Sequence, residues 1–255
     1  MKLGVCCAEN GFSAVGKSGF SYAEIATAFV RGKDNASILE LKKRAEENGL
    51  TIDGFNGFFT GNISLYNDPI DKLLDFSEEA FNAAAVLGAS YCVVGSGAYR
   101  AVPEGMDREK AYDSFMNLMD HMGKRAAGYG VEVILEPLRK AETNLLNTFS
   151  EGLEFCRAIG NPNVGCLVDF YHFFMNGEDL SVFDTLRPGE LRHVHIARPD
   201  PDRGQPKAED AAVLKEWADA LKRAGYSGRV SVECAWKGDF EQGTKEAYAN
   251  LEAFR

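Results

Sequence analysis

The 255-residue sequence has little positive charge. Its 28 Lys and Arg residues are outnumbered by 38 Asp and Glu residues, and the formal net charge is −10. A surface of this sign repels a phosphate backbone, so we expect no nucleic-acid partner. The first residues, MKLGVCCAEN, pass from a short apolar run directly into polar residues. That run is too short for a signal peptide or a membrane span, so no membrane partner is expected either.

The six cysteines lack the spacing of a metal or redox motif. They stand at positions 6, 7, 92, 156, 166 and 234, with no CxxC pair and no zinc-finger pattern. Several fall inside apolar, strand-like runs, which is typical of buried free thiols in a reducing compartment. We therefore expect a cytoplasmic protein.

No Pro/Ser-rich linker or low-complexity tract divides the chain, and its length suits one barrel domain. Short apolar runs instead alternate with segments of helical length. Strands are predicted at 2–7, 21–25, 52–59, 91–95, 131–136, 164–169, 191–196 and 229–234. Most of these runs are rich in Val, Ile, Leu and Cys, as parallel strands covered on both faces are. The second run, SYAEI, fits this pattern least well.

The segments between the strands have helical periodicity. In 107–128, apolar residues recur at spacings of three and four, and Gly130 is a predicted helix stop. Segment 210–223 behaves in the same way and is followed by Gly225. Eight strands alternating with helices predict an α/β fold, a single (β/α)8 TIM barrel over residues 1–255. An open doubly wound sheet is the structural alternative.

Four ligand-type residues interrupt the apolar runs at or near the carboxyl ends of four consecutive strands. They are Glu136, Asp169, His195 and Glu233. In a barrel these ends surround one mouth, and burying three carboxylates there without a cation is very costly. Each residue alone would be explained as a salt-bridged or core group, but the set of four favours a metal site. Its many oxygens and single nitrogen suit Mn²⁺ or Mg²⁺, with Co²⁺ and Zn²⁺ as alternatives.

The same half of the chain resembles a known family. The segments that carry the resemblance are VILEPLRKAETNLLNT (133–148), VDFYH (168–172), HVHIA (193–197) and GYSGRVSVECAW (225–236). They are similar to the xylose isomerase-like superfamily of TIM barrels, the sugar phosphate isomerases/epimerases. Within it they most resemble the ketose 3-epimerases that act on D-tagatose and D-psicose.

The resemblance implies roles for individual residues. Glu136, Asp169, His195 and Glu233 correspond to the metal ligands of that family, and Mn²⁺ is the metal we expect. Glu136 and Glu233 also correspond to its pair of proton-transfer residues. Glu142 matches a substrate-positioning glutamate.

Two further positions bear on substrate binding. His172 matches a substrate-binding histidine of these epimerases. They usually carry a substrate-binding arginine about six residues after the metal histidine, where this chain has Pro201. Arg198 and Arg203 flank that place, and Arg203 is preferred because the intervening PDPD stretch is expected to form a turn.

These observations predict a metal-dependent isomerase that epimerises C3 of a ketose through a cis-enediolate, with Glu136 and Glu233 transferring the proton. An aldose–ketose or hydroxypyruvate-type isomerase and an inosose dehydratase are alternatives on the same barrel. An endonuclease IV-like repair enzyme is a remote alternative, because its three-metal site needs many histidines and this chain has four. The expected partner is a small sugar, and a homo-oligomer is compatible with the sequence.

Overall fold

Eight parallel strands close into a barrel in the computed structural model, which describes residues 1–255. The strands are hydrogen-bonded in chain order, and the last closes on the first, with Lys2 opposite Arg229. They are β1 (Lys2–Cys6), β2 (Tyr22–Ala26), β3 (Thr51–Asn56), β4 (Tyr91–Val94), β5 (Glu132–Leu135), β6 (Val164–Asp169), β7 (Leu191–Ile196) and β8 (Arg229–Val232). This confirms the predicted TIM barrel.

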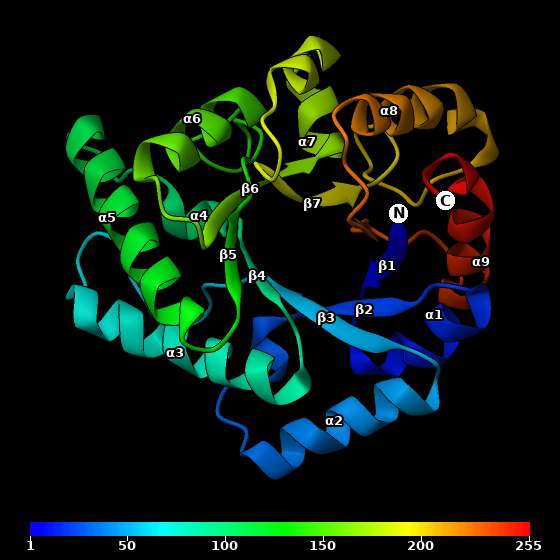
Figure 1. Ribbon diagram of the computed structural model, residues 1–255, viewed down its shortest axis with the longest axis horizontal. Helices are drawn as coiled ribbons and strands as arrows, with labels where there is room; N and C mark the ends of the chain where they lie inside the picture. The colour runs from blue at the N-terminus through cyan, green and yellow to red at the C-terminus, as the bar shows by residue number, and fades with distance from the viewer.

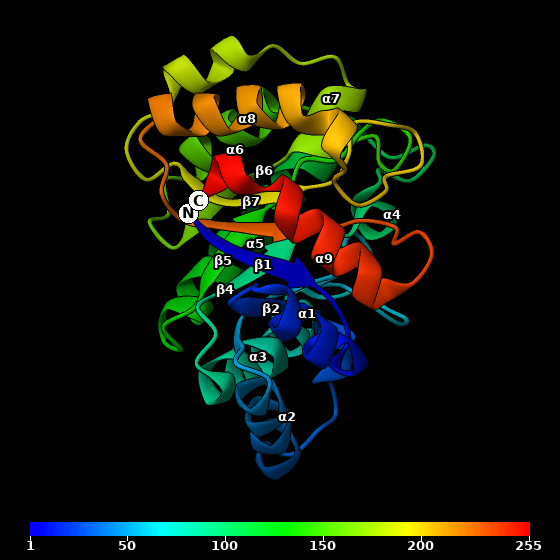
Figure 2. The same cartoon turned by 90° about the vertical axis from the view of Figure 1, so that its right-hand side faces the viewer.

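Nine α-helices surround the strands (Figure 1). They are α1 (Phe12–Ser18), α2 (Asn35–Glu47), α3 (Ile70–Leu87), α4 (Gly97–Arg100), α5 (Arg108–Ala127), α6 (Phe149–Ile159), α7 (Phe170–Met175), α8 (Ala211–Arg223) and α9 (Phe240–Asn250). Short 3₁₀ helices are η1 (Glu9–Gly11), η2 (Thr27–Phe29), η3 (Leu180–Thr185), η4 (Ala208–Asp210) and η5 (Glu252–Phe254). Helices α1 and α9, from opposite ends of the chain, pack side by side (Figures 1 and 2). None of the helices combines the length and apolar character needed to cross a membrane.

Several predicted elements extend past the ends of the observed ones, and two of them show why. The third strand ends at Asn56 rather than at position 59, because Gly57 adopts a left-handed φ of 53° that strand geometry excludes. Helix α5 begins after Asp107, whose side chain accepts from the backbone N–H of Lys110 at 2.9 Å. It ends at Ala127, ahead of the predicted stop at Gly130.

Two apolar regions stabilise the barrel. A cluster of 59 buried residues fills the space between the strands and the helices. A separate group, made of Tyr91, Val93, Ile134 and Leu167, lies on alternate positions of β4, β5 and β6. Since side chains on a strand alternate between its two faces, this second group lies inside the barrel.

The carboxyl ends of the strands form one side of the molecule. In Figure 2, β1 runs from left to right, and the short helices α4 and α7 lie at the side toward which it points. Helix α7 begins directly after the last residue of β6. Polar residues near strand ends are therefore gathered at this mouth, where the chemistry of this fold is located.

We expect Gly54→Ala to lower the free energy of unfolding by about 1–3 kcal/mol, the usual cost of overpacking a core. A Cβ at position 54 would lie 2.2 Å from the ring of Tyr91. That ring is buried, and its hydroxyl donates to Glu24 at 2.8 Å, so it cannot move aside without losing the hydrogen bond. Urea denaturation measures the change.

Gly128→Ala is the matched control, because its Cβ would meet only the backbone oxygen of Arg125, at 3.3 Å. Its unfolding free energy should stay within about 0.5 kcal/mol of wild type. Equal stability of Gly54→Ala and the wild type would contradict the close packing described here.

Candidate active site

Four side chains from strand ends come together at the mouth of the barrel. Glu136 follows β5, Asp169 ends β6, His195 lies in β7 and Glu233 follows β8. One ligand-type atom from each lies within 4.8 Å of the others. Nδ1 of His195 is 3.2 Å from a carboxylate oxygen of Glu136 and 3.3 Å from one of Glu233. We call these four residues the strand-end cluster.

The guanidinium of Arg203 places positive charge within the strand-end cluster. Its Nη2 donates to carboxylate oxygens of both Asp169 and Glu233. Burial opposes the charge of Arg203, but the neighbouring carboxylates outweigh burial and raise its pKa above the ordinary value. A cation is thus already accommodated among these oxygens. The donor set of three carboxylates and one imidazole therefore fits a divalent metal.

The two glutamates of the strand-end cluster differ in their electrostatic surroundings. Burial, together with repulsion from Glu233, raises the pKa of Glu136. Burial also disfavours ionised Glu233, but His195 and Arg203 outweigh it and lower the pKa of Glu233 to about 2. Neighbouring carboxyl groups whose pKa values are pushed apart can act as a proton donor and a proton acceptor. The pair is therefore suited to acid–base chemistry.

Polar contacts from neighbouring elements hold the carboxylates in place. Asp169 caps α7, because its Oδ1 accepts a backbone N–H of the first turn at 2.8 Å, and Oδ2 remains directed at the cluster. Nδ2 of Asn56 donates to Glu233 at 3.3 Å. Arg100 is fully buried, and its Nη1 donates to the backbone oxygen of Glu136 at 2.8 Å. The sequence analysis identified neither Asn56 nor Arg100.

His172 and Glu142 lie beside the strand-end cluster. Nε2 of His172 is 3.6 Å from Asp169 Oδ2, and its Nδ1 is 3.8 Å from Glu142 Oε1. Both ring nitrogens of His172 are buried, and neither has a hydrogen-bond partner. Glu142 accepts from Nε of Arg139 at 2.9 Å. Since buried polar groups are almost always paired, the free nitrogens of His172 are available to a bound ligand.

The structure separates the two arginines that flank Pro201. Arg203 reaches the strand-end cluster, as described above. Arg198 does not, because its guanidinium is held by three other carboxylates, those of Asp200, Glu209 and Asp210. Of the two arginines, Arg203 is the one whose guanidinium lies among the strand-end carboxylates.

A buried glutamate that the sequence analysis did not single out lies against His195. Glu24 of β2 accepts from Nε2 of His195 at 2.9 Å and from Nε2 of His193 at 2.8 Å. His193 stands two residues before His195 on β7, so it faces the same side one layer deeper, and it is fully buried. The available signal was the charged residue within the run SYAEI. It made this run the least strand-like of the eight, but it also marked a polar position inside the barrel.

Comparison with known proteins places these features in a family. A family model described as "Xylose isomerase-like TIM barrel" matches residues 12–254. The D-psicose 3-epimerase of Ruminiclostridium cellulolyticum is 28% identical over 232 residues, which cover 86% of this chain and 75% of that protein. The 2-oxo-tetronate isomerase of Pectobacterium atrosepticum is 28% identical over 226 residues, or 83% of this chain and 82% of that protein.

Solved structures share the fold along the whole chain. A crystal structure of D-psicose 3-epimerase with D-tagatose, from Clostridium cellulolyticum H10, superposes with a TM-score of 0.82 at 23% identity. The superposition covers 100% of this chain and 98% of the other. The eight-stranded barrel is therefore common to both proteins.

Removing one member of the strand-end cluster should abolish stoichiometric metal binding. We expect Asp169→Ala and His195→Ala to lose bound Mn²⁺ on dialysis, because each change removes one of four converging ligand atoms. Elemental analysis measures the metal, and circular dichroism checks the fold. Asp169→Ala also removes the cap of α7, which costs about 1 kcal/mol. Arg198→Ala, outside the cluster, should keep its metal, and full occupancy in both cluster variants would refute the metal site.

Proposed function

We propose that this isomerase, which belongs to the xylose isomerase-like TIM barrel family, inverts C3 of a ketose with the help of one divalent metal. The observation that carries the proposal is the arrangement of Glu136 and Glu233. They follow β5 and β8, two strands that are not neighbours, and their carboxylates meet around His195. Two carboxylates that approach one centre from different walls suit removal of a proton from one face and its return to the other.

The strand-end cluster would hold the metal, with Mn²⁺ as the preferred ion and Mg²⁺, Co²⁺ or Zn²⁺ as alternatives. When bound, such an ion supplies Lewis-acid polarisation of a carbonyl oxygen and makes the neighbouring C–H more acidic. The donor set and the guanidinium of Arg203 among its carboxylates support this assignment.

The proton transfers are assigned to the two glutamates. One of them removes the proton from C3 as the general base, which gives a cis-enediolate of the sugar. The other returns a proton to the opposite face of the same carbon. His172, with both nitrogens unpaired, would hydrogen-bond the sugar oxygens near the carbonyl, and Glu142 beside it would position a hydroxyl. Arg203, whose guanidinium lies beside Asp169 and Glu233, would also hydrogen-bond the sugar.

A sugar-acid isomerase is the second candidate, and a specific arrangement favours it. The guanidinium groups of Arg139 and Arg203 each lie 5.0 Å from the ring centre of Tyr171. Two cations on one aromatic side chain could bind the carboxylate of a sugar acid. The relative named 2-oxo-tetronate isomerase agrees with such a substrate. On this reading the proton would return to the neighbouring carbon instead of to C3.

We expect Glu136→Gln and Glu233→Gln each to lower turnover by at least about 10²-fold, the usual scale of general acid–base catalysis. Glutamine keeps the size and one oxygen ligand, so part of the metal should remain bound. Turnover of free ketoses with added Mn²⁺, in heavy water, measures both the rate and the site of deuterium uptake. Deuterium should enter at C3.

Two results would contradict the two-glutamate mechanism. Near-normal turnover of either variant would remove that glutamate from proton transfer. A product without deuterium would indicate hydride transfer. Deuterium at the original carbonyl carbon, in a product whose carbonyl has moved to the neighbouring carbon, would favour the second candidate.

The loops after β7 and β8 favour a free sugar over a sugar phosphate. Phosphate-binding barrels commonly use helix N-termini in these two loops. Here Asp239 caps α9 by accepting the backbone N–H of Gln242 at 2.8 Å. Asp210 likewise accepts the backbone N–H of Lys207 at 2.9 Å, at the start of η4. The backbone N–H groups of Gln242 and Lys207 thus already donate to carboxylates and are not available to a phosphate.

We therefore expect a higher kcat/KM for a ketose than for its terminal phosphate ester, under the same metal and salt. The like charge of Asp239 and Asp210 repels the ester, and Arg198 is already paired with carboxylates. Steady-state kinetics on both substrates measures the preference. A phosphate preference of about tenfold or more that disappears in Lys207→Ala would overturn the expectation.

A further inference from the structure

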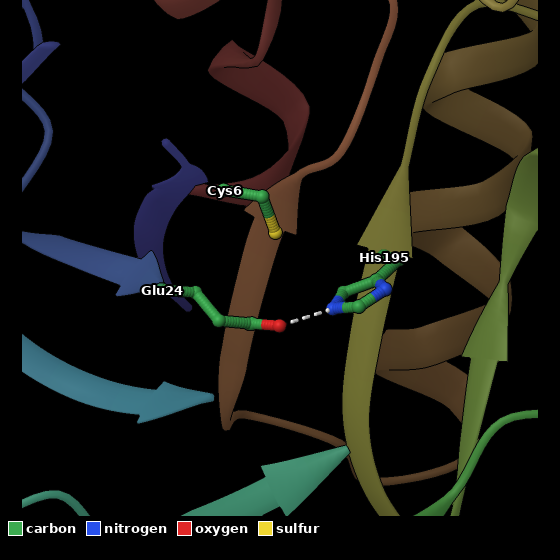
Figure 3. Close-up of side chains that lie close together, drawn as sticks. All are labelled: Cys6, Glu24 and His195. Atoms are coloured by element: carbon green, nitrogen blue, oxygen red, sulfur yellow. Dashed lines mark hydrogen bonds and ion pairs between the residues drawn. The ribbon is translucent and has the colours of Figure 1, made fainter. Parts of the chain in front are cut away.

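Below the strand-end cluster lies a second, fully buried polar layer. Its centre is Glu24, whose Oε2 accepts from Nε2 of His193, from the hydroxyl of Tyr91 and from the hydroxyl of Ser231, each at 2.8 Å. Its other oxygen, Oε1, accepts from Nε2 of His195 at 2.9 Å. Four donors therefore fix one carboxylate. Figure 3 shows Glu24 reaching across from β2 to the ring of His195.

The local backbone and the neighbouring donors suit this position. The pairing of β2 with β3 shifts register between Ala23 and Glu24, and such irregularities re-aim side chains near active sites. Because donors surround both of its oxygens, Glu24 is a carboxylate that only accepts hydrogen bonds.

The carboxylate of Glu24 determines which ring nitrogen of His195 carries the proton and which one has the lone pair. A neutral imidazole carries one N–H, and the carboxylate of Glu24 requires that proton on Nε2. The lone pair then lies on Nδ1, the atom that is 3.2 Å from Glu136 and 3.3 Å from Glu233. The opposite tautomer would place two lone pairs, on Nε2 and on Oε1 of Glu24, against each other.

We propose that Glu24 is a positioning residue of the metal centre, which fixes the ring orientation and the tautomer of His195 so that Nδ1 faces the three carboxylates. The inference rests on the proposed metal-dependent function. Partners of this kind raise the basicity of a ligating histidine, and their loss typically weakens metal binding by about 10–100-fold. Glu24 itself touches neither the metal position nor the substrate.

The same neighbourhood could instead be read as a second metal site, because Cys6, Glu24 and His195 also bring ligand-type atoms within 4.8 Å of one another. One observation favours the supporting role, because both oxygens of Glu24 are already engaged by four donors.

The test is the affinity of the metal-free protein for Mn²⁺, measured by isothermal titration calorimetry. Glu24→Gln offers one oxygen, which can serve His195 or the three other donors but not both groups. We expect its Mn²⁺ dissociation constant to rise by about 10-fold and that of Glu24→Ala by up to about 100-fold. In the Zn²⁺-loaded wild type, ¹⁵N NMR of His195 should show the proton on Nε2, with disorder or reversal in Glu24→Gln.

Tyr91→Phe and Ser231→Ala are matched controls. Each removes one donor to Oε2 of Glu24 and leaves the bond from Oε1 to His195 intact. We expect both to lower the thermal stability as Glu24→Gln does, with Mn²⁺ affinities close to that of the wild type. This pattern would support the proposal.

Four results would overturn it. Wild-type Mn²⁺ affinity in both Glu24 variants would reduce Glu24 to a packing role and leave the proposed function standing. If Tyr91→Phe and Ser231→Ala lose as much Mn²⁺ affinity as the Glu24 variants, Glu24 likewise has only a packing role. Two Zn²⁺ per chain, with one lost in Cys6→Ser, would establish a second metal site instead. A wild type that binds no metal would overturn the proposed function as well.

Discussion

Three carboxylates share the mouth of a closed barrel, and their mutual repulsion is the constraint around which the rest of this structure is arranged. Glu136, Asp169 and Glu233 are fixed by the ends of strands that cannot separate, because each strand is hydrogen-bonded on both sides. Three carboxylates in a largely buried site are unfavourable unless positive charge lies among them. Arg203 supplies part of that compensation, and a metal would supply more of it.

The charge at the mouth also explains why the barrel interior is polar one layer deeper. TIM barrels are usually filled by branched apolar residues, but here Glu24, His193 and Ser231 lie under the strand-end cluster. A buried carboxylate is tolerated because four donors satisfy it, and each donor comes from a different residue. A slip of one strand by one residue would break both layers at once, so the hydrogen bonds that support His195 also specify the strand register.

The sequence predicted the barrel well because its signals are local. Apolar runs of strand length recur eight times, and the four ligand-type residues each sit at a strand end, where the fold dictates their convergence. Glu24 could not be assigned a role, because its partners lie 67 to 207 residues further along the chain. Arg198 and Arg203 could not be separated by spacing, since the turn between them decides which guanidinium faces the site.

The strand ends and the loops contribute different groups to the site, and the strained backbone lies in the loops. Ser96, Leu146 and Arg203 are the non-glycine residues with a positive φ, and all three lie in loops after strands β4, β5 and β7. Left-handed backbone at such residues is unfavourable and persists only where surrounding contacts compensate for it. For Arg203 the compensation is its pair of carboxylates, Asp169 and Glu233. The strand ends thus fix the four cluster residues, whereas the substrate contact proposed for Arg203 depends on a strained loop. Changes in these loops can alter the substrate while the strand-end cluster stays in place, and relatives of similar length named as epimerases and isomerases fit this reasoning.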